Sequence, residues 1–184
     1  MSTTAVETGR LTTWSIDPAH SHVEFSVKHL MIATVKGRFG VVRGTVTTDE
    51  TDPAKGHAEI EIDADSIDTR EPQRDAHLRS ADFFDVETFP KLTFRSTKIA
   101  DVNGSAFTLI GDLTIHGVTR EVPLDVVSEG RGKDPWGGER AGFSATGRIK
   151  RSDFGLTWNQ VLETGGFVVG DEIRIAVDVE LVRQ

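Results

Sequence analysis

Residues 19–30 read AHSHVEFSVKHL, and the alternation within them decides the fold class. Val23, Phe25 and Val27 are separated from one another by single polar residues. Successive side chains of a β-strand point to opposite faces, so this period of two predicts a strand with one face turned toward an apolar interior. His29 falls in the same phase as the three apolar residues, which makes it a candidate polar group aimed into that interior.

The same alternation recurs along the rest of the chain. It is clearest in residues 171–182, DEIRIAVDVELV, where Ile173, Ile175 and Val177 share one face. Further strands are expected at 13–17, 34–49, 57–65, 91–99, 106–117, 119–129 and 139–151. Eight or nine strands with one short helix and no strand–helix–strand alternation predict an all-β antiparallel barrel or sandwich.

Certain residues predict irregularities within these strands. Gly37, Gly40 and Gly44 are too closely spaced for a flat strand and predict bulges or strong coiling. Pro123 cannot donate a ladder hydrogen bond, so its strand is expected to be an edge or to carry a local irregularity. The HGVT sequence at residues 116–119 predicts a tight turn between two strands.

Two segments break the alternation. Residues 72–80 begin with proline and place Asp75 and Arg79 at the spacing of an ion pair on a helix, so they predict a short helix followed by an irregular segment. Residues 151–171 form a long connection that is rich in apolar side chains. Connections of this length are uncommon unless they serve a function or cover something, so we expect this one to pack over a barrel opening.

Composition limits the class of protein. The 184 residues fit a single barrel domain over 13–184, preceded by a flexible segment at 1–12. No apolar run approaches the roughly 20 residues of a membrane helix, so no stable membrane insertion is expected. A net charge of −8 disfavours binding to nucleic acid or to anionic membranes. The N-terminal sequence lacks the pattern of a secretory signal, which predicts a cytoplasmic protein, with a periplasmic or secreted mature form as the alternative.

Several motifs together resemble the YceI-like family of lipocalin-like, polyisoprenoid-binding proteins. They are WSIDPAHSHVEFSVKHL, VKGRFG, SIDTREPQRDAHLRSADFFDVETFPKLTF, GDLTIHGVTREV, RSDFGLTWN and VGDEIRI, which together extend over residues 14–181 with gaps between them. The resemblance implies an extended eight-stranded antiparallel barrel, to which the residue patterns above add a short helix and a long apolar loop. It further implies a channel for a polyisoprenoid or similar long-chain amphiphile, assembly as a homodimer, and no catalytic residues.

Candidate ligand-binding residues follow from the phase of the strands and from the apolar loop. The interior of an eight-stranded barrel is filled by its own side chains or holds one ligand. His29, with Arg74 and His77 of the predicted helix, forms a candidate polar contact for a head group. The apolar wall candidates are Phe25, Val27, Val35, Phe39, Ile60, Phe94, Leu113, Ile115, Phe143, Leu156 and Trp158.

Alternatives to ligand binding remain open at this point. Any apolar candidate is equally compatible with a filled core, and His29 with a hydrogen-bonded residue at a strand end. His20 and His22 are spaced to share a strand face, so a metal site completed by His77 or His116 is an alternative function. A lipid isomerase or cyclase is another, although no motif pairs a nucleophile with a base, and no cofactor is predicted.

Overall fold

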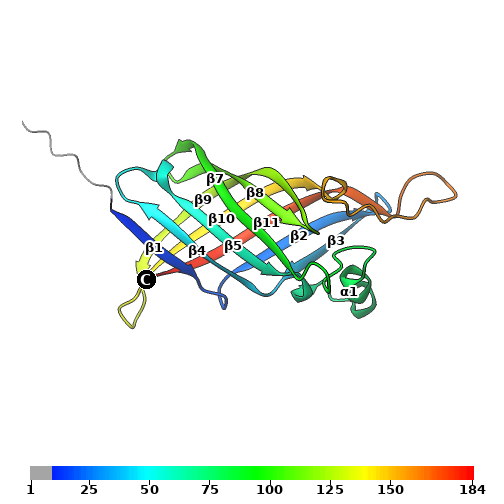
Figure 1. Ribbon diagram of the computed structural model, residues 1–184, viewed down its shortest axis with the longest axis horizontal. Coiled ribbons are helices and arrows are strands. Elements are labelled where there is room, and N and C mark those ends of the chain that lie inside the picture. The colour runs from blue at the N-terminus through cyan, green and yellow to red at the C-terminus, as the bar shows by residue number, and fades with distance from the viewer. Residues whose placement is uncertain (1–9) are drawn as a thin grey trace, which may run out of the picture.

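The computed structural model describes residues 10–184, which form one elongated barrel with a helical segment at one end (Figure 1). The strands are β1 (Leu11–Ile16), β2 (His22–His29), β3 (Ala33–Phe39), β4 (Val42–Asp49), β5 (His57–Asp63), β6 (Ile67–Asp68), β7 (Lys91–Asn103), β8 (Ala106–Ile115), β9 (Val118–Lys133), β10 (Glu139–Lys150) and β11 (Val169–Arg183). The helices are α1 (Pro72–Arg79) and the 3₁₀ turns η1 (Pro53–Lys55), η2 (Ala64–Ser66) and η3 (Arg151–Phe154).

These strands form an antiparallel barrel with eight strand positions around the ring, and we call each position a stave. Three staves are interrupted strands: β1 with β2, β3 with β4, and β5 with β6. β11 is long enough to pair with β2 along its first part and with β1 near its end, where Ile16 lies opposite Leu181. Since β1 also pairs with β4, this contact closes the ring and confirms the predicted eight-stranded barrel.

Three glycines lie in the stave formed by β3 and β4. Gly40 lies at the break between β3 and β4. At Gly44 a Cβ atom would lie 2.2 Å from the Glu59 carbonyl oxygen, so only glycine allows β4 and β5 to approach this closely. At Gly37 a Cβ would lie 2.4 Å from the Phe25 ring, which packs over this position. The strand predicted over 34–49 is thus interrupted at Gly40, and its ladders contain no bulge.

The other predicted irregularities are present as well. His116 and Gly117 both have positive φ, as a type I′ hairpin turn requires, and they join β8 to β9. Pro123 pairs with Ile110 of β8, whereas the ladder between β9 and β10 ends at Asp125. The missing N–H of Pro123 thus falls where β9 has no ladder partner on its β10 side.

The helix forms where it was predicted, but one predicted contact is wrong. Asp75 does not pair with Arg79, because its carboxylate accepts hydrogen bonds from the backbone N–H and hydroxyl of Thr69. Arg79 instead reaches Asp65 at 3.0 Å and the Ile67 carbonyl at 2.9 Å. Both side chains therefore tie α1 to the segment before it, which helical spacing alone could not indicate.

The N-terminal segment is only partly described. Most of the predicted flexible segment at 1–12 lies outside the described residues, and Leu11 and Thr12 already belong to β1.

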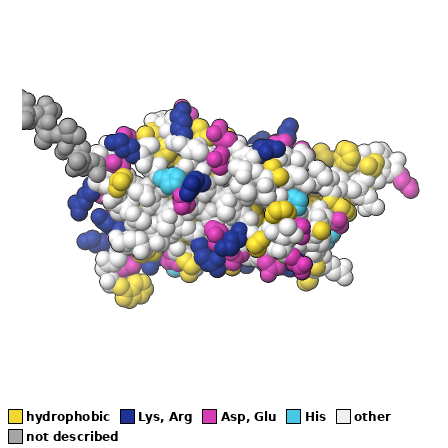
Figure 2. All heavy atoms as spheres, in the orientation of Figure 1, with side chains coloured by type: hydrophobic (Ala, Val, Ile, Leu, Met, Phe, Trp, Pro, Cys, Tyr) yellow, Lys and Arg dark blue, Asp and Glu magenta, His cyan; other side chains and the backbone are white. Residues whose placement is uncertain are grey.

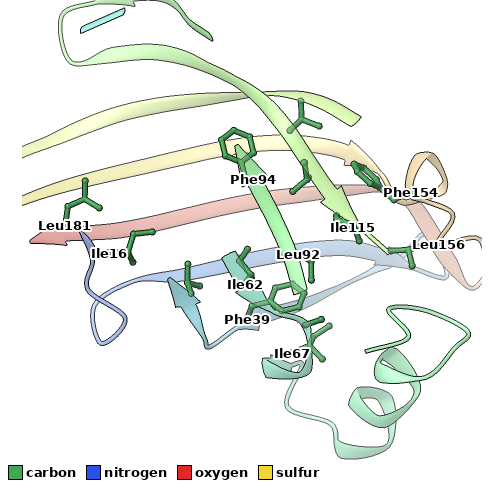
Figure 3. Close-up of a cluster of buried hydrophobic side chains, with 14 of the residues drawn as sticks. Ile16, Phe39, Ile62, Ile67, Leu92, Phe94, Ile115, Phe154, Leu156 and Leu181 are labelled. Carbon is green, nitrogen blue, oxygen red and sulfur yellow. The ribbon is translucent and has the colours of Figure 1, made fainter. Parts of the chain in front are cut away.

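The interior side chains form one continuous apolar cluster. Figure 3 shows these side chains pointing inward from strands on different sides of the barrel. Near the β1 side Trp14, Ile16 and Leu181 are almost completely buried. Near α1 the buried group includes Phe39, Ile67 and Phe154. We call the end that carries α1, η3 and the loop after η3 the helix end of the barrel (Figure 1).

Candidate functional site

An apolar cavity of about 270 Å³ occupies the barrel interior. Its wall consists almost entirely of hydrocarbon side chains that come from strands around the barrel. β11 contributes every second residue from Ile173 to Leu181, which is the alternation seen in the sequence. A cavity walled in this way recognises a ligand mainly by burying its apolar surface.

The cavity follows much of the length of β11. Ile173, Ile175, Val177 and Val179 point inward yet are only half-buried, because they face space that no other side chain fills. Leu181, further along the same strand, is completely buried. The stretch from Ile173 to Val179 measures about 20 Å along a strand that rises ~3.3 Å per residue. The cavity is therefore elongated rather than round.

Side chains from the helical segment close the cavity at the helix end. Leu78 of α1 and Phe83 and Phe84 after it line the cavity. Phe84 packs edge-on against Phe39 of β3, with 5.6 Å between ring centroids. Leu156, from the loop after η3, contributes to the same wall. The loop therefore packs over this end of the barrel through Leu156, as the sequence predicted, whereas Val161 and Phe167 of the same loop are exposed.

Arg151 is a buried charged side chain in the cavity wall, and it holds the loop at the helix end in place. It is 7% exposed, and its guanidinium donates hydrogen bonds to main-chain carbonyls of Leu156 at 2.7 Å, Trp158 at 2.8 Å and Gly170 at 2.8 Å. Burial lowers the pKa of Arg151 below its ordinary value. These bonds join the two ends of the segment that connects η3 to β11.

The structure divides the sequence-predicted ligand residues into two groups. Val35 lies half-buried on β3 outside the cavity wall, and Trp158 packs instead on His77 and Phe83, with ring centroids 4.7 and 5.3 Å away. Their role in ligand binding stays a prediction, as it does for the residues that line the cavity. Those that line it are Phe25, Val27, Phe39, Ile60, Phe94, Leu113, Ile115, Phe143 and Leu156.

The predicted polar cluster for a head group does not assemble. His29 ends β2 half-buried and is not part of the cavity wall. Arg74 donates to the hydroxyl and the carbonyl of Thr69, at 2.7 and 2.8 Å. His77 pairs with Asp82 at 2.8 Å. Arg74 and His77 thus have local partners, and among the described residues Arg151 is the buried cation at the cavity wall.

Arg151 and many apolar residues of the cavity wall were not among the ligand-binding residues predicted from the sequence. The omitted apolar residues carried a usable signal, because their strand phase matches that of the predicted ones. Arg151 carried none, since its partners are carbonyl groups of the main chain. The additional apolar wall residues include Val42, Val46, Ile62, Leu92, Leu109, Val122, Leu124, Val126, Ile149, Ile173 and Ile175.

His20 and His22 have different partners, so the structure does not bring them together as the alternative of a metal site required. His20 lies in the turn before β2 and pairs with Asp17 at 2.9 Å, whereas His22 lies 3.5 Å from Asp178. Within residues 10–184 the group with metal-ligand geometry is Asp17, His20 and Glu180. Its two carboxylates already accept hydrogen bonds from Arg140.

This group is therefore an ion-pair network. Hydrogen bonds from His20 and Arg140 lower the pKa of Asp17 from 3.8 to about 2. The hydrogen bond to Asp17, with the nearby charge of Glu180, raises the pKa of His20.

A chain of hydrogen bonds joins Ser96, His57 and Glu59. The Ser96 hydroxyl lies 3.1 Å from His57 Nδ1, and His57 Nε2 lies 3.2 Å from Glu59 Oε1. The same hydroxyl accepts the Ala58 N–H at 2.8 Å beside the bulge of β7, and Ser96 is 5% exposed. The geometry therefore fits a serine that satisfies an irregular ladder better than it fits an accessible nucleophile.

Comparison with known proteins shows the family to which this chain belongs. The model of the YceI-like domain matches residues 14–181, which is nearly the whole chain. This chain belongs to the YceI-like family. A UPF0312 protein of Yersinia enterocolitica is 40% identical over 164 residues, covering 89% of this chain and 82% of its own. One from Staphylococcus aureus is 37% identical over 171 residues, covering 92% and 97%.

Solved structures of YceI-like proteins share the barrel. Burkholderia cenocepacia BcnA superposes with a TM-score of 0.78 at 28% identity, over 90% of this chain and 98% of its own. The YceI protein of Campylobacter jejuni gives 0.72 at 32% identity, over 85% and 90%. A polyisoprenoid binding domain from Saccharophagus degradans gives 0.65 at 17% identity, over 95% and 100%, which is a likeness of fold alone.

Among residues 10–184, no helix is both long enough and apolar enough to cross a membrane.

Proposed function

We propose that this YceI-like protein binds a long-chain amphiphile, such as a polyisoprenoid, in its barrel cavity and acts as a carrier, store or sensor of it rather than as an enzyme. The observation that carries this proposal is the row of inward-facing, half-buried side chains along β11. A barrel that merely filled its interior would bury such residues completely, as it does Leu181.

Two further points support the choice of ligand class. The cavity is elongated and walled by hydrocarbon, which suits a flexible apolar tail better than a compact polar molecule. The domain from Saccharophagus degradans that is described as polyisoprenoid binding has a related fold, which supports this choice of ligand class. Each buried methylene contributes about 0.8 kcal/mol, so a long tail binds without strong polar contacts.

The first test is native mass spectrometry of protein purified without detergent, followed by denaturing extraction of what it carries. We expect a stoichiometric long-chain amphiphile that is released on unfolding. Protein that is empty and also fails to take up added geranylgeraniol or hexadecanol would refute the proposal. Preference for geranylgeraniol over hexadecanol would favour isoprenoids, and equal binding would favour amphiphiles in general.

A pair of alanines provides matched variants. Ala145 of β10 lines the cavity beside Val177, whereas Ala176 of β11 faces outward and is exposed. Ala145→Phe fills part of the cavity and is expected to weaken geranylgeraniol binding at least tenfold. Ala176→Phe adds the same ring outside the barrel and is expected to leave binding unchanged. Equal affinities of the two variants would place the ligand elsewhere.

Assembly and location are further proposals. We propose a homodimer, as the family resemblance implied, located in the cytoplasm, as the N-terminal sequence predicted. Sedimentation equilibrium and cell fractionation test the two statements separately. A monomer at all concentrations, or recovery outside the cytoplasmic fraction, would contradict the corresponding one.

A further inference from the structure

Four large apolar side chains are exposed together at the helix end. Met31 and Ile32, in the turn between β2 and β3, are 68% and 83% exposed. Val161 and Phe167, in the loop between η3 and β11, are 72% and 55% exposed. We call these four residues the apolar tip. Figure 2 shows hydrophobic side chains on the loop that projects from this end of the barrel.

Hydrogen bonds hold the two segments of the apolar tip beside each other. The Leu30 N–H donates to the Val168 carbonyl at 2.8 Å, directly next to Met31 on one side and Phe167 on the other. Within the loop, Val161 and Phe167 form an isolated β-bridge. Figure 1 shows the loop extending beyond the barrel. The apolar tip is thus a projecting, hydrogen-bonded structure that leaves its side chains in water.

The backbone of the turn between β2 and β3 adds a second, independent observation. Leu30 and Met31 have φ of 53° and 61°, and the Ile32 N–H bonds back to the His29 carbonyl. Leu30 and Met31 are the two central residues of a β-turn from His29 to Ile32, and a pair with these angles is ordinarily Asn-Gly, because glycine and asparagine adopt positive φ at low cost. Here two bulky apolar residues occupy it at a cost in both strain and hydration, which is typical of a functional position.

We propose that the apolar tip docks the protein on an uncharged lipid surface. Exposed apolar patches mark sites that meet proteins or membranes. The four side chains expose about 500 Å² in total, given that a whole aromatic side chain buries about 150–250 Å². A stable protein interface takes about 800 Å² from each partner. A lipid surface needs no such matching area, and it receives convex, projecting side chains.

Charge indicates which kind of lipid surface is suited to the tip. Segments 30–34 and 157–168 contain no lysine or arginine, and Glu163 lies between Val161 and Phe167. The cations that contact these segments through hydrogen bonds between described residues are Lys28, whose ammonium donates to the Thr34 hydroxyl at 3.1 Å, and the buried Arg151. The whole chain has a net charge of −8. Anionic lipids attract basic segments and would repel this surface. Docking is therefore driven by the apolar side chains alone and is expected to be insensitive to salt concentration.

The apolar tip continues directly into the cavity wall. The segment that carries Val161 and Phe167 is flanked by Leu156 and Val169, which both line the cavity. A docked protein would hold the helix end of the cavity against the lipid surface. Docking itself depends only on the exposed side chains, so it does not require that the cavity binds a ligand.

The experiment measures partition of the intact protein onto phosphatidylcholine vesicles by flotation. We expect the protein to float with these vesicles at low and high NaCl concentration, and to float less with phosphatidylglycerol vesicles. The double variant Ile32→Ser, Phe167→Ser is expected to partition about 100-fold more weakly, at about tenfold for each large side chain. Trp136, which is 87% exposed in the turn between β9 and β10, provides the control. Trp136→Ser is expected to leave partition unchanged.

A second variant separates docking from folding. Leu30→Asn, Met31→Gly installs the preferred turn sequence, so it is expected to melt no lower than the wild type while partitioning about tenfold more weakly. The proposal is overturned if wild-type protein does not float with phosphatidylcholine, or if the tip variants float as well as it does. If the wild-type protein does not bind vesicles and the tip variants no longer dimerise, the apolar tip binds a second copy of the chain instead of a lipid surface. The cavity variant Ala145→Phe should still float, which distinguishes failure of docking from failure of ligand binding.

Discussion

Replacing Arg151 with methionine would test whether a single side chain holds the helix end of the cavity together. Methionine has an unbranched side chain of similar reach and no donors, so the carbonyls of Leu156, Trp158 and Gly170 lose their bonds to the guanidinium. An unsatisfied buried polar group costs about 1–3 kcal/mol. The Leu156 bond is buried, whereas the other two lie nearer the surface, where water replaces part of what is lost.

The variant also relieves the burial of a charge that Asp171 offsets only in part. Balancing these contributions, we expect Arg151→Met to lower the free energy of unfolding by about 2–4 kcal/mol. Urea denaturation measures this loss. Hydrogen exchange of the amides in residues 156–170 should show where it occurs, because this segment is the part that opens first.

Arg148, near the end of β10 and three residues before Arg151, provides a control. It lies 3.6 Å from Glu172, and its side chain is 64% exposed. Exposed ion pairs contribute little, so Arg148→Met is expected to change the free energy of unfolding by no more than about 0.5 kcal/mol. An Arg151→Met protein that matches this control in stability and in hydrogen exchange would refute the assigned role of Arg151.

Two further predictions concern Asp17 in the ion-pair network and Gly44 of β4. The pKa of Asp17 is about 2 in the folded protein against an ordinary 3.8, so its contribution to stability is present above pH 3.8 and is lost as the pH falls toward 2. Asp17→Asn should therefore flatten the fall in Tm over that window, and equal slopes in variant and wild type would contradict the assignment. Gly44→Ala is expected to destabilise the barrel by about 1–3 kcal/mol, because its Cβ meets the Glu59 carbonyl, whereas Gly40→Ala meets nothing within 4 Å. Equal urea midpoints for the two alanine variants would show that β4 and β5 can separate without cost.

The barrel could be predicted from the sequence because each of its long strands has its own alternation of apolar and polar residues. Every inward-facing residue of β11 follows from a period of two, and Pro72 marks the beginning of α1. Phase does not reveal whether the interior is filled. Ile175 and Leu181 have the same phase, yet only the second is completely buried. That difference depends on how many staves surround the space and how far they coil, which is a property of the whole ring.

The polar contacts were harder to predict because their partners are not side chains at regular spacing. Arg151 bonds to main-chain carbonyls, and Asp75 bonds to the backbone of Thr69. His29 shows a different limit. Its phase matches that of Val27, but β2 ends at His29, and the cavity wall does not include this position. A pattern along a strand predicts which face a residue takes and not how much of the barrel lies beyond it.

Closure of the ring by β11 has a consequence for how the protein folds. Ser15 pairs with Val182, so the contact that completes the barrel joins residues from nearly opposite ends of the described chain. Contacts between such distant residues slow folding, because the entropy of loop closure is lost before the contact is gained. Until β11 docks, β1 and β2 present open strand edges and the future cavity wall faces water. We expect a lipid that is present while β11 docks to cover this wall and to favour closure over aggregation.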